Sequence, residues 1–163
     1  MRVLGVDCGS LSTGYGIVEN DGRQHRLLTY GAIRMAAREE FSRRLLKIHD
    51  TLQKLIEEYH PHEVAVEGQF YFTNFKSVLK LGQVKGVVLL AAARAGLPVT
   101  EYSPLEIKSA VTGYGRAEKG QVQVMVKTLL GMSEFPQPHD AADALAITLC
   151  HLNTAATRRK TGG

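Results

Sequence analysis

The sequence lacks the features that mark a secreted or membrane-bound chain. It has only two cysteines, Cys8 and Cys150, which lie far apart and match no metal-ligand spacing, so we expect a reduced, cytoplasmic protein. The longest apolar run, residues 86–93, is about half of the roughly 20 residues that a membrane span needs. Asp7 interrupts the apolar N-terminal segment within a few residues, which argues against a signal peptide.

The size and the charge balance favour one globular domain with a polyanionic partner. The chain has 163 residues, of which 44% are apolar and 22% are charged. We expect residues 1–155 to form a single domain and the basic tail 156–163, which has no apolar anchor, to be disordered. Twenty lysines and arginines against sixteen acids give a net charge of +4, which suits a partner rich in phosphate.

Hydrophobic periodicity predicts three strands, then strands alternating with helices, then a closing helix. Short runs of β-branched and aromatic residues, with an Asn-Asp-Gly turn at 20–22, predict strands at 2–6, 13–18, 26–35, 63–66 and 99–102. Apolar residues spaced by three and four predict helices at 39–59, 75–95, 105–111, 119–130 and 138–155. The predicted fold class is α/β with a mixed sheet, in which antiparallel strands lie beside a partly parallel core.

Two acids stand where apolar strands are predicted to end. Asp7 opens a glycine-containing turn after 2–6, and Glu67 directly follows the apolar run 64–66. Ligands of α/β proteins tend to bind at the ends of strands, and an acid after so apolar a strand is unfavourable unless it is paired or metal-bound. The alternatives are a turn or capping aspartate at Asp7 and an exposed strand-terminal glutamate at Glu67.

A second pair of acids opens the closing helix. Asp140 and Asp143 are three residues apart, so they lie on one helix face, and the stretch 144–149 that follows is almost entirely apolar. Acids in a first helical turn also complement the helix dipole, which is the alternative explanation. The small residues Ala141 and Ala142 would allow a close approach to this helix.

Taken together, the four acids predict a metal-dependent nuclease. Carboxylates that converge at one end of a sheet repel one another and raise one another's pKa unless cations neutralise them. Clusters made only of oxygen ligands select hard ions such as Mg²⁺ or Mn²⁺. Two such ions about 4 Å apart can activate water and stabilise the leaving oxygen of a phosphodiester.

Motifs along nearly the whole chain resemble the RuvC family, the bacterial Holliday-junction resolvases. The motifs follow in the order of that family and cover about 2–151: Gly5-Val6-Asp7-Cys8-Gly9, Thr13-Gly14-Tyr15-Gly16, Val66-Glu67-Gly68-Gln69-Phe70, Lys80-Leu81-Gly82-Gln83, Ala117-Glu118-Lys119 with Gln121-Val122, and Asp140-Ala141-Ala142-Asp143-Ala144-Leu145-Ala146.

The resemblance implies a fold, a reaction and partners. It implies an RNase H-like fold with a five-stranded mixed sheet and helices on both faces, and a homodimer that makes paired symmetric nicks in four-way DNA junctions during recombination and repair. It also implies Mg²⁺ as cofactor, two ions per subunit with Mn²⁺ able to substitute, 5′-phosphate and 3′-hydroxyl products, and the branch-migration complex RuvA–RuvB as a partner. The catalytic and metal-binding residues that it implies are Asp7, Glu67, Asp140 and Asp143.

Further residues are expected to contact DNA, namely Phe70, Lys76, Lys80, Lys108, Arg116 and Lys119. Lys108 and Lys119 match family lysines near the scissile phosphate. Lys119 also follows a basic, glycine-containing loop suited to a phosphate backbone, and a lysine in a first helical turn is otherwise slightly unfavourable. Phe70 matches the aromatic that wedges into the junction; the alternative is packing in the core or the dimer. His139 is interpreted as a capping residue or an outer neighbour of the acids, with a smaller chance of proton transfer.

Several alternatives remain open on sequence grounds. Cys8 stands where the family usually has proline, and we hypothesise that it makes the site sensitive to oxidation; Gly68 stands where a larger residue is usual. Gly82 and Gly86, four apart in a predicted helix, indicate tight internal packing, whereas the resemblance places that helix in a dimer interface. A junction-binding protein without activity, or an actin-like or kinase-type nucleotide-binding fragment, is the competing functional class.

Overall fold

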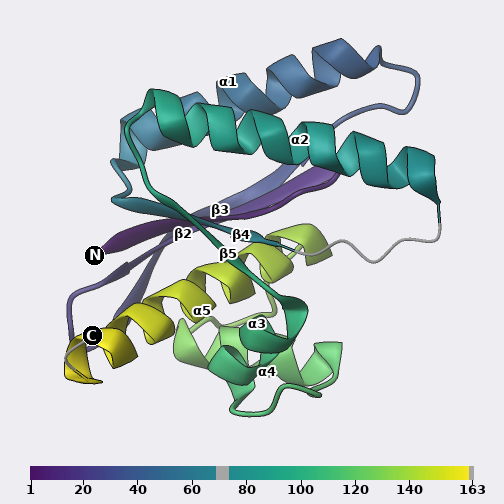
Figure 1. Cartoon of the computed structure of the whole chain (residues 1–163). Coiled ribbons are helices and arrows are strands. Elements are labelled where there is room, and N and C mark those ends of the chain that lie inside the picture. Colours follow the sequence, from purple (N-terminus) through teal and green to yellow (C-terminus); the bar gives the residue numbers. More distant parts are fainter. Residues whose placement is uncertain (69–73, 162–163) are drawn as a thin grey trace.

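The computed structural model describes residues 1–68 and 74–161, without the side chains of 158–161, and its centre is one five-stranded sheet (Figure 1). The strands are β1 (Arg2–Asp7), β2 (Ser12–Asn20), β3 (His25–Arg34), β4 (Glu63–Glu67) and β5 (Val99–Tyr102). Their order across the sheet is β3-β2-β1-β4-β5, with β1, β2 and β3 antiparallel and β4 and β5 parallel to β1. The mixed sheet predicted from the sequence is therefore confirmed.

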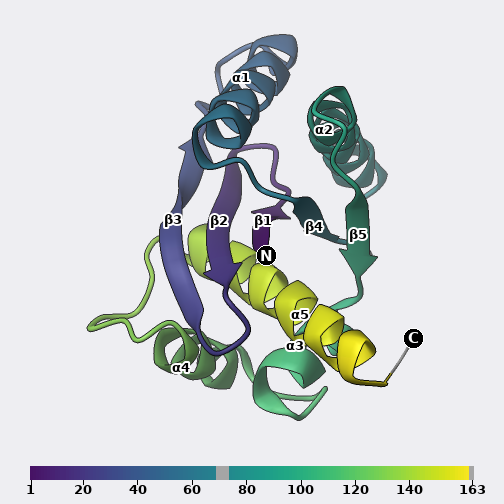
Figure 2. The ribbon, with the colours of Figure 1, turned by 90° about the vertical axis from the view of Figure 1, so that its left-hand side faces the viewer.

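Helices cover both faces of this sheet, as Figure 2 shows. On one face lie α1 (Phe41–Tyr59) and α2 (Phe75–Arg94), and on the other lie α3 (Pro104–Thr112), α4 (Lys119–Leu129) and α5 (His139–Thr161). The helix predicted to end near Ala155 continues to Thr161, so the tail that was expected to be disordered begins as helix. Within the described residues, no helix has the length and apolar character required to cross a lipid bilayer.

Each face of the sheet has its own apolar core because side chains alternate along a strand. In β4, Val64 and Val66 pack with α1 and α2, whereas Ala65 between them packs with α3, α4 and α5. In the core on the α3, α4 and α5 side of the sheet, α5 contributes an almost continuous buried stretch from Ala141 to Leu152. This helix lies across all five strands, so its position determines where its two N-terminal acids lie.

Glycines on the two central strands allow α5 to approach the sheet closely. Gly5 pairs with Gly16 across β1 and β2, and Gly14 lies two residues before Gly16 on the same face. A Cβ at Gly5 would overlap Thr148 and the carbonyl oxygen of Ala144, and one at Gly16 would overlap the Leu145 side chain. A side chain at any of these positions would push α5 outwards, so glycine is required for the observed packing.

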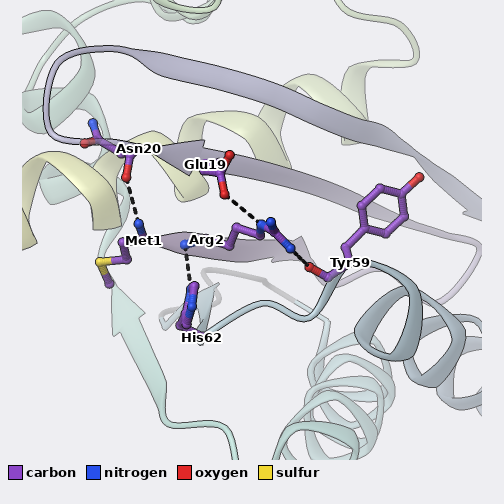
Figure 3. A network of polar contacts seen from close by, with 6 residues as sticks. All are labelled: Met1, Arg2, Glu19, Asn20, Tyr59 and His62. Carbon is purple, nitrogen blue, oxygen red and sulfur yellow. Dashed lines mark hydrogen bonds and ion pairs between the residues drawn. The ribbon is translucent and has the colours of Figure 1, made fainter.

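A polar network fixes the start of β1 (Figure 3). The Arg2 guanidinium donates to Glu19 of β2 at 2.9 Å and to the backbone oxygen of Tyr59, the last residue of α1, at 2.6 Å. The backbone N–H of Arg2 donates to Nδ1 of His62 at 2.8 Å, and the His62 N–H returns a bond to the Arg2 carbonyl at 2.9 Å. These contacts hold β1 in register with both neighbours, and its register places Asp7.

Candidate active site

Asp7 and Glu67 lie at the ends of adjacent parallel strands. Val6 of β1 is the register partner of Val66 of β4, and the next residue on each strand is the acid. The C-terminal ends of parallel strands meet at one edge of a sheet, where α/β proteins bind ligands. The two side chains predicted from apolar strand ends therefore stand next to each other.

The first turn of α5 brings the other two acids to the same edge. Gly14 is the register partner of Asp7, and a Cβ at Gly14 would overlap the carbonyl oxygen of Asp140. The backbone of Asp140 thus rests directly on the strand pair that carries Asp7, and Asp143 lies one turn further along α5. Sequence reasoning missed the role of Gly14; its signal was a glycine inside a predicted strand, which often marks a close backbone approach.

Asp7 is close enough to the other three acids for their charges to act on it. Burial and the negative charges of Asp143, Glu67 and Asp140, in that order, together raise the pKa of Asp7 to about 7, against the opposing charge of Lys119. Burial and the charge of Asp143 also raise the pKa of Glu67, against the opposing charges of Lys108 and Lys119. A group held at a pKa so far from 3.8 is typical of functional sites.

Two lysines stand beside these acids in a cleft of about 240 Å³. Glu67 and Asp143 line the cleft together with Lys108 of α3 and Lys119 of α4, and the apolar lining comes from Pro104, Ile107, Val122, Ala146 and Ile147. Lys119 Nζ donates to Asp143 Oδ2 at 2.8 Å. Burial acts to lower the pKa of Lys119, but its bond to Asp143 and the nearby acids outweigh that effect and raise it. Lys119 therefore carries its charge in the lining of the cleft, next to Asp143.

The donor set matches a hard divalent cation in chemistry. All four acids offer only oxygen ligands, and burial and neighbouring negative charges raise the pKa values of Asp7 and Glu67, an environment that a divalent cation would relieve. Within residues 1–68 and 74–161, however, no group of three or more His, Cys, Asp or Glu side chains is arranged so that it could hold a metal ion. The acids share one electrostatic environment without forming a finished coordination sphere.

Comparison with known proteins identifies the family. Residues 3–151 match the family model described as "Crossover junction endodeoxyribonuclease RuvC". The chain belongs to the RuvC family. It is 52% identical to a crossover junction endodeoxyribonuclease RuvC of Koribacter versatilis over 158 residues, which covers 96% of this chain and 95% of that protein. A corresponding protein of Moorella thermoacetica is 50% identical over 160 residues and 98% of this chain, with 96% of the relative covered.

A solved RuvC structure confirms the architecture. The structure of Thermus thermophilus RuvC in complex with a Holliday junction substrate superposes with a TM-score of 0.92, at 37% identity and with 96% of each chain covered. The sheet order and the helices on both faces are thus those of the RNase H-like fold predicted from the sequence. Membership of the RuvC family also removes the actin-like and kinase-type alternative.

Of the other residues expected to contact DNA, Lys76, Lys80 and Arg116 are exposed and do not line this cleft, and Phe70 lies outside the described part of the chain. Lys76 and Lys80 are exposed on the first turns of α2, which starts at the same end of the molecule as α5 (Figure 1). Lys80 Nζ lies 5.8 Å from the ring centroid of Phe41. Arg116 is exposed in the loop between α3 and α4. Phe70 lies outside the described residues, so its role stays a prediction.

His139 is the first residue of α5, and its Nδ1 lies 3.1 Å from Nε2 of Gln123 on α4. The side chain is exposed, and it is not among the residues that line the cleft. This geometry fits a residue that joins the starts of α4 and α5, in keeping with the supporting role predicted for it.

The two departures from the RuvC pattern have different consequences. Burial and the negative charge of Asp7 together raise the pKa of the Cys8 thiol to about 12. A protonated thiol reacts slowly with oxidants, and the hypothesis of an oxidation-sensitive site stays a prediction that cleavage by Cys8→Pro would test. A Cβ at Gly68 would lie 3.1 Å from Oε2 of Glu101, so glycine leaves room there for a charged neighbour.

Proposed function

We propose that this chain cuts four-way (Holliday) DNA junctions by hydrolysis that depends on divalent metal ions. The observation that carries the proposal is the joint electrostatic environment of four carboxylates around Asp7, with Lys119 bonded to Asp143, in a member of a family of crossover junction endodeoxyribonucleases. Thermus thermophilus RuvC, which shares the fold, has been solved with a Holliday junction substrate.

Asp7, Glu67, Asp140 and Asp143 would hold Mg²⁺, with two ions per subunit and Mn²⁺ as a substitute. When bound, these ions supply Lewis-acid activation of water and of the phosphodiester. Burial and the charges of the other three acids together raise the pKa of Asp7 to about 7, so a cation bound there would relieve that repulsion. The Asp7 carboxylate is the group whose removal should affect hydrolysis most.

The lysines would stabilise the charge that develops on the scissile phosphate. Lys119 lines the cleft, and its bond to Asp143 keeps Nζ pointed towards the carboxylates. Lys108 lines the same cleft. Water attacks phosphorus in line and the bond to the 3′ oxygen breaks, which leaves 5′-phosphate and 3′-hydroxyl ends. A positive charge aimed at the phosphate lowers the barrier of such a displacement.

The decisive experiment compares nicking of a synthetic four-way junction with nicking of a linear duplex of the same sequence, with and without Mg²⁺. Wild type should cut the junction selectively and only with Mg²⁺ or Mn²⁺. Asp7→Asn should abolish cutting and preserve junction binding, because it removes charge while keeping shape. Asp50→Asn, at an exposed position on α1, is the matched control. A wild type that binds junctions but never cuts them would leave only a non-catalytic binding function.

The chain would act as a homodimer joined through α2. Phe75, Leu79 and Leu90 each expose more than half of their surface along one face of this helix. A Cβ at Gly82 or Gly86, on the same face, would meet nothing within 4 Å, so these glycines do not serve internal packing. A continuous apolar stripe with a flat centre is suited to a second copy of the same helix, related by a two-fold axis.

Sedimentation velocity tests the dimer. Leu79→Glu combined with Leu90→Glu should convert the dimer into a monomer because it places charges in the centre of the stripe. Leu46→Glu, at an exposed leucine of α1 outside the stripe, should leave the dimer intact. A monomeric wild type at micromolar concentration would exclude this arrangement, and so would a dimer in the double variant.

The family membership also supports two proposals on cellular context. The relatives are bacterial proteins, and we propose the bacterial cytoplasm as the place where this chain meets junction DNA. We further propose the branch-migration complex RuvA–RuvB as a partner. Co-sedimentation of the chain with RuvA–RuvB on a four-way junction, compared with the junction alone, tests this partner.

A further inference from the structure

The peptide that follows Glu67 is held on both of its sides. The N–H of Gly68 donates to the carbonyl oxygen of Tyr102 at 2.9 Å, which extends the pairing of β4 with β5 by one residue. The carbonyl oxygen of Gly68 accepts a hydrogen bond from Lys85 Nζ at 3.3 Å. Strand ends usually splay apart once pairing stops, but here an ammonium group from α2 secures the backbone directly after an acid of the site.

Lys85 is itself held in place by Glu101 of β5. Lys85 Nζ lies 2.5 Å from Glu101 Oε2, and only 12% of the Lys85 side chain is exposed. Glu101 is the register partner of Val66, so its side chain stands beside the end of β4. Because Gly68 has no Cβ, the Glu101 carboxylate can lie against it, since a Cβ there would approach Oε2 to 3.1 Å. The departure from the family pattern at Gly68 therefore fits this contact.

Lys85 donates to the backbone carbonyl of Gly68, directly after Glu67. The cations that oppose the raised pKa of Glu67 are Lys108 and Lys119, both on the cleft side of the sheet. Lys85 comes from the middle of α2, on the opposite face, and its ammonium reaches the end of β4 there. Its bond to the Gly68 carbonyl constrains the Glu67 backbone, whereas Lys108 and Lys119 act on the charge of the carboxylate.

We propose that Lys85 is a positioning residue for Glu67: by binding the Gly68 carbonyl and the Glu101 carboxylate together, it fixes the end of β4 so that Glu67 points at the metal ions. This inference rests on the proposed metal-dependent hydrolysis. The Lys85 side chain would thereby connect α2, the helix proposed for the dimer interface, to the strand end that carries Glu67. Outer contacts that orient a metal ligand typically change metal affinity or activity by about 10- to 100-fold when they are removed.

Three measurements on Lys85→Met test the proposal: the Mg²⁺ dependence of single-turnover junction nicking, Mn²⁺ binding to the free protein by calorimetry, and junction binding in Ca²⁺. We expect the half-saturating Mg²⁺ concentration and the Mn²⁺ dissociation constant to rise by about 10-fold or more, with junction affinity unchanged. Lys85→Arg should restore most of the metal affinity because it keeps a cationic donor. Lys54→Met, at an exposed lysine of α1, is the matched control and should behave as wild type.

The proposal would be overturned if Lys85→Met had the same Mg²⁺ dependence of nicking and the same Mn²⁺ affinity as wild type. A loss of junction affinity equal to the loss of nicking would do the same, since it would assign Lys85 to DNA binding. If Lys85→Met fails to fold, Glu101→Gln carries the comparison, because it leaves Lys85 in place without its orienting charge. Unchanged metal binding in Glu101→Gln would then refute the role.

The two proposals fail in different ways. A wild type that does not nick junctions with Mg²⁺ or Mn²⁺ rejects the proposed hydrolysis. In that case the calorimetric comparison of Lys85→Met with wild type still decides whether Lys85 shapes the acidic site. A wild type that nicks junctions, beside a Lys85→Met variant with the same metal affinity, rejects only the positioning role.

Discussion

Replacing Asp7 by asparagine should stabilise the metal-free protein although it destroys the proposed active site. The pKa of Asp7 is raised from 3.8 to about 7 by burial and by the three neighbouring acids. One pKa unit corresponds to about 1.36 kcal/mol, so ionised Asp7 destabilises the fold by up to about 4 kcal/mol. Because the cleft beside it is open to water, we expect a measured gain of about 2–4 kcal/mol in Asp7→Asn.

The effect has a defined pH dependence. The folded chain keeps the Asp7 proton up to about pH 7, whereas the unfolded chain releases it near pH 3.8. Between these values the folded state binds more protons, so the contribution of Asp7 to stability falls as the pH rises and becomes constant above about pH 7. The difference in unfolding free energy between Asp7→Asn and wild type should therefore grow from pH 4 to pH 7 and then level off.

Urea denaturation in the presence of EDTA, between pH 5 and pH 8.5, measures this difference. Asp50→Asn controls for the loss of one surface charge and should show no comparable rise. Added Mg²⁺ should stabilise wild type more than Asp7→Asn, because a ligand that binds only the folded state raises its stability by mass action. If Asp7→Asn were no more stable than wild type at pH 8 in EDTA, the crowding of carboxylates around Asp7 would be wrong.

Two other substitutions test the packing and the charge of the site. Gly14→Ala should destabilise the protein by about 1–3 kcal/mol in urea denaturation because its Cβ would overlap the Asp140 carbonyl oxygen. Gly120→Ala, whose Cβ would meet nothing within 4 Å, is the control and should leave stability unchanged or raise it by up to about 1 kcal/mol. If Gly14→Ala and Gly120→Ala lost the same amount of stability, the close approach of α5 to the sheet would be contradicted. Lys119→Met should slow single-turnover nicking by about 100-fold, with partial recovery in Lys119→Arg. Nicking at the wild-type rate in Lys119→Met would show that its bond to Asp143 serves stability only.

The strand-end acids were predictable because their signal is local. An apolar run that stops at an acid indicates both where a strand ends and which side chain stands there, and the register of Val6 with Val66 agrees with that inference. The first turn of α5 was predictable for the same reason, since Asp140 and Asp143 precede a long apolar stretch. Periodicity also located most helix boundaries to within two residues, although the charged end of α5 gave no sign that the helix continues to Thr161.

Contacts between distant parts of the chain were not predictable from one sequence. The packing of α5 against the sheet depends on Gly5, Gly14 and Gly16. That these three glycines lie on the same face of the sheet is visible only once β1 and β2 are paired in register. Lys119 and Asp143 are 24 residues apart, and Lys85 and Glu101 are 16 apart, so each looks like an ordinary surface charge until the fold joins them. The protonated state of Cys8 likewise follows from burial and from the charge of Asp7, neither of which the sequence shows.

The late position of α5 in the chain has a consequence for protein synthesis. A nascent chain that has emerged only as far as α4 holds Asp7 and Glu67 but neither acid of α5, and the sheet face that α5 covers is still bare. Such a chain therefore carries only two of the four acids that we propose as metal ligands, and one of the two apolar cores lacks the helix that contributes more buried residues to it than any other element. A potentially harmful DNA-cutting activity is thereby withheld until nearly all of the described chain has been made.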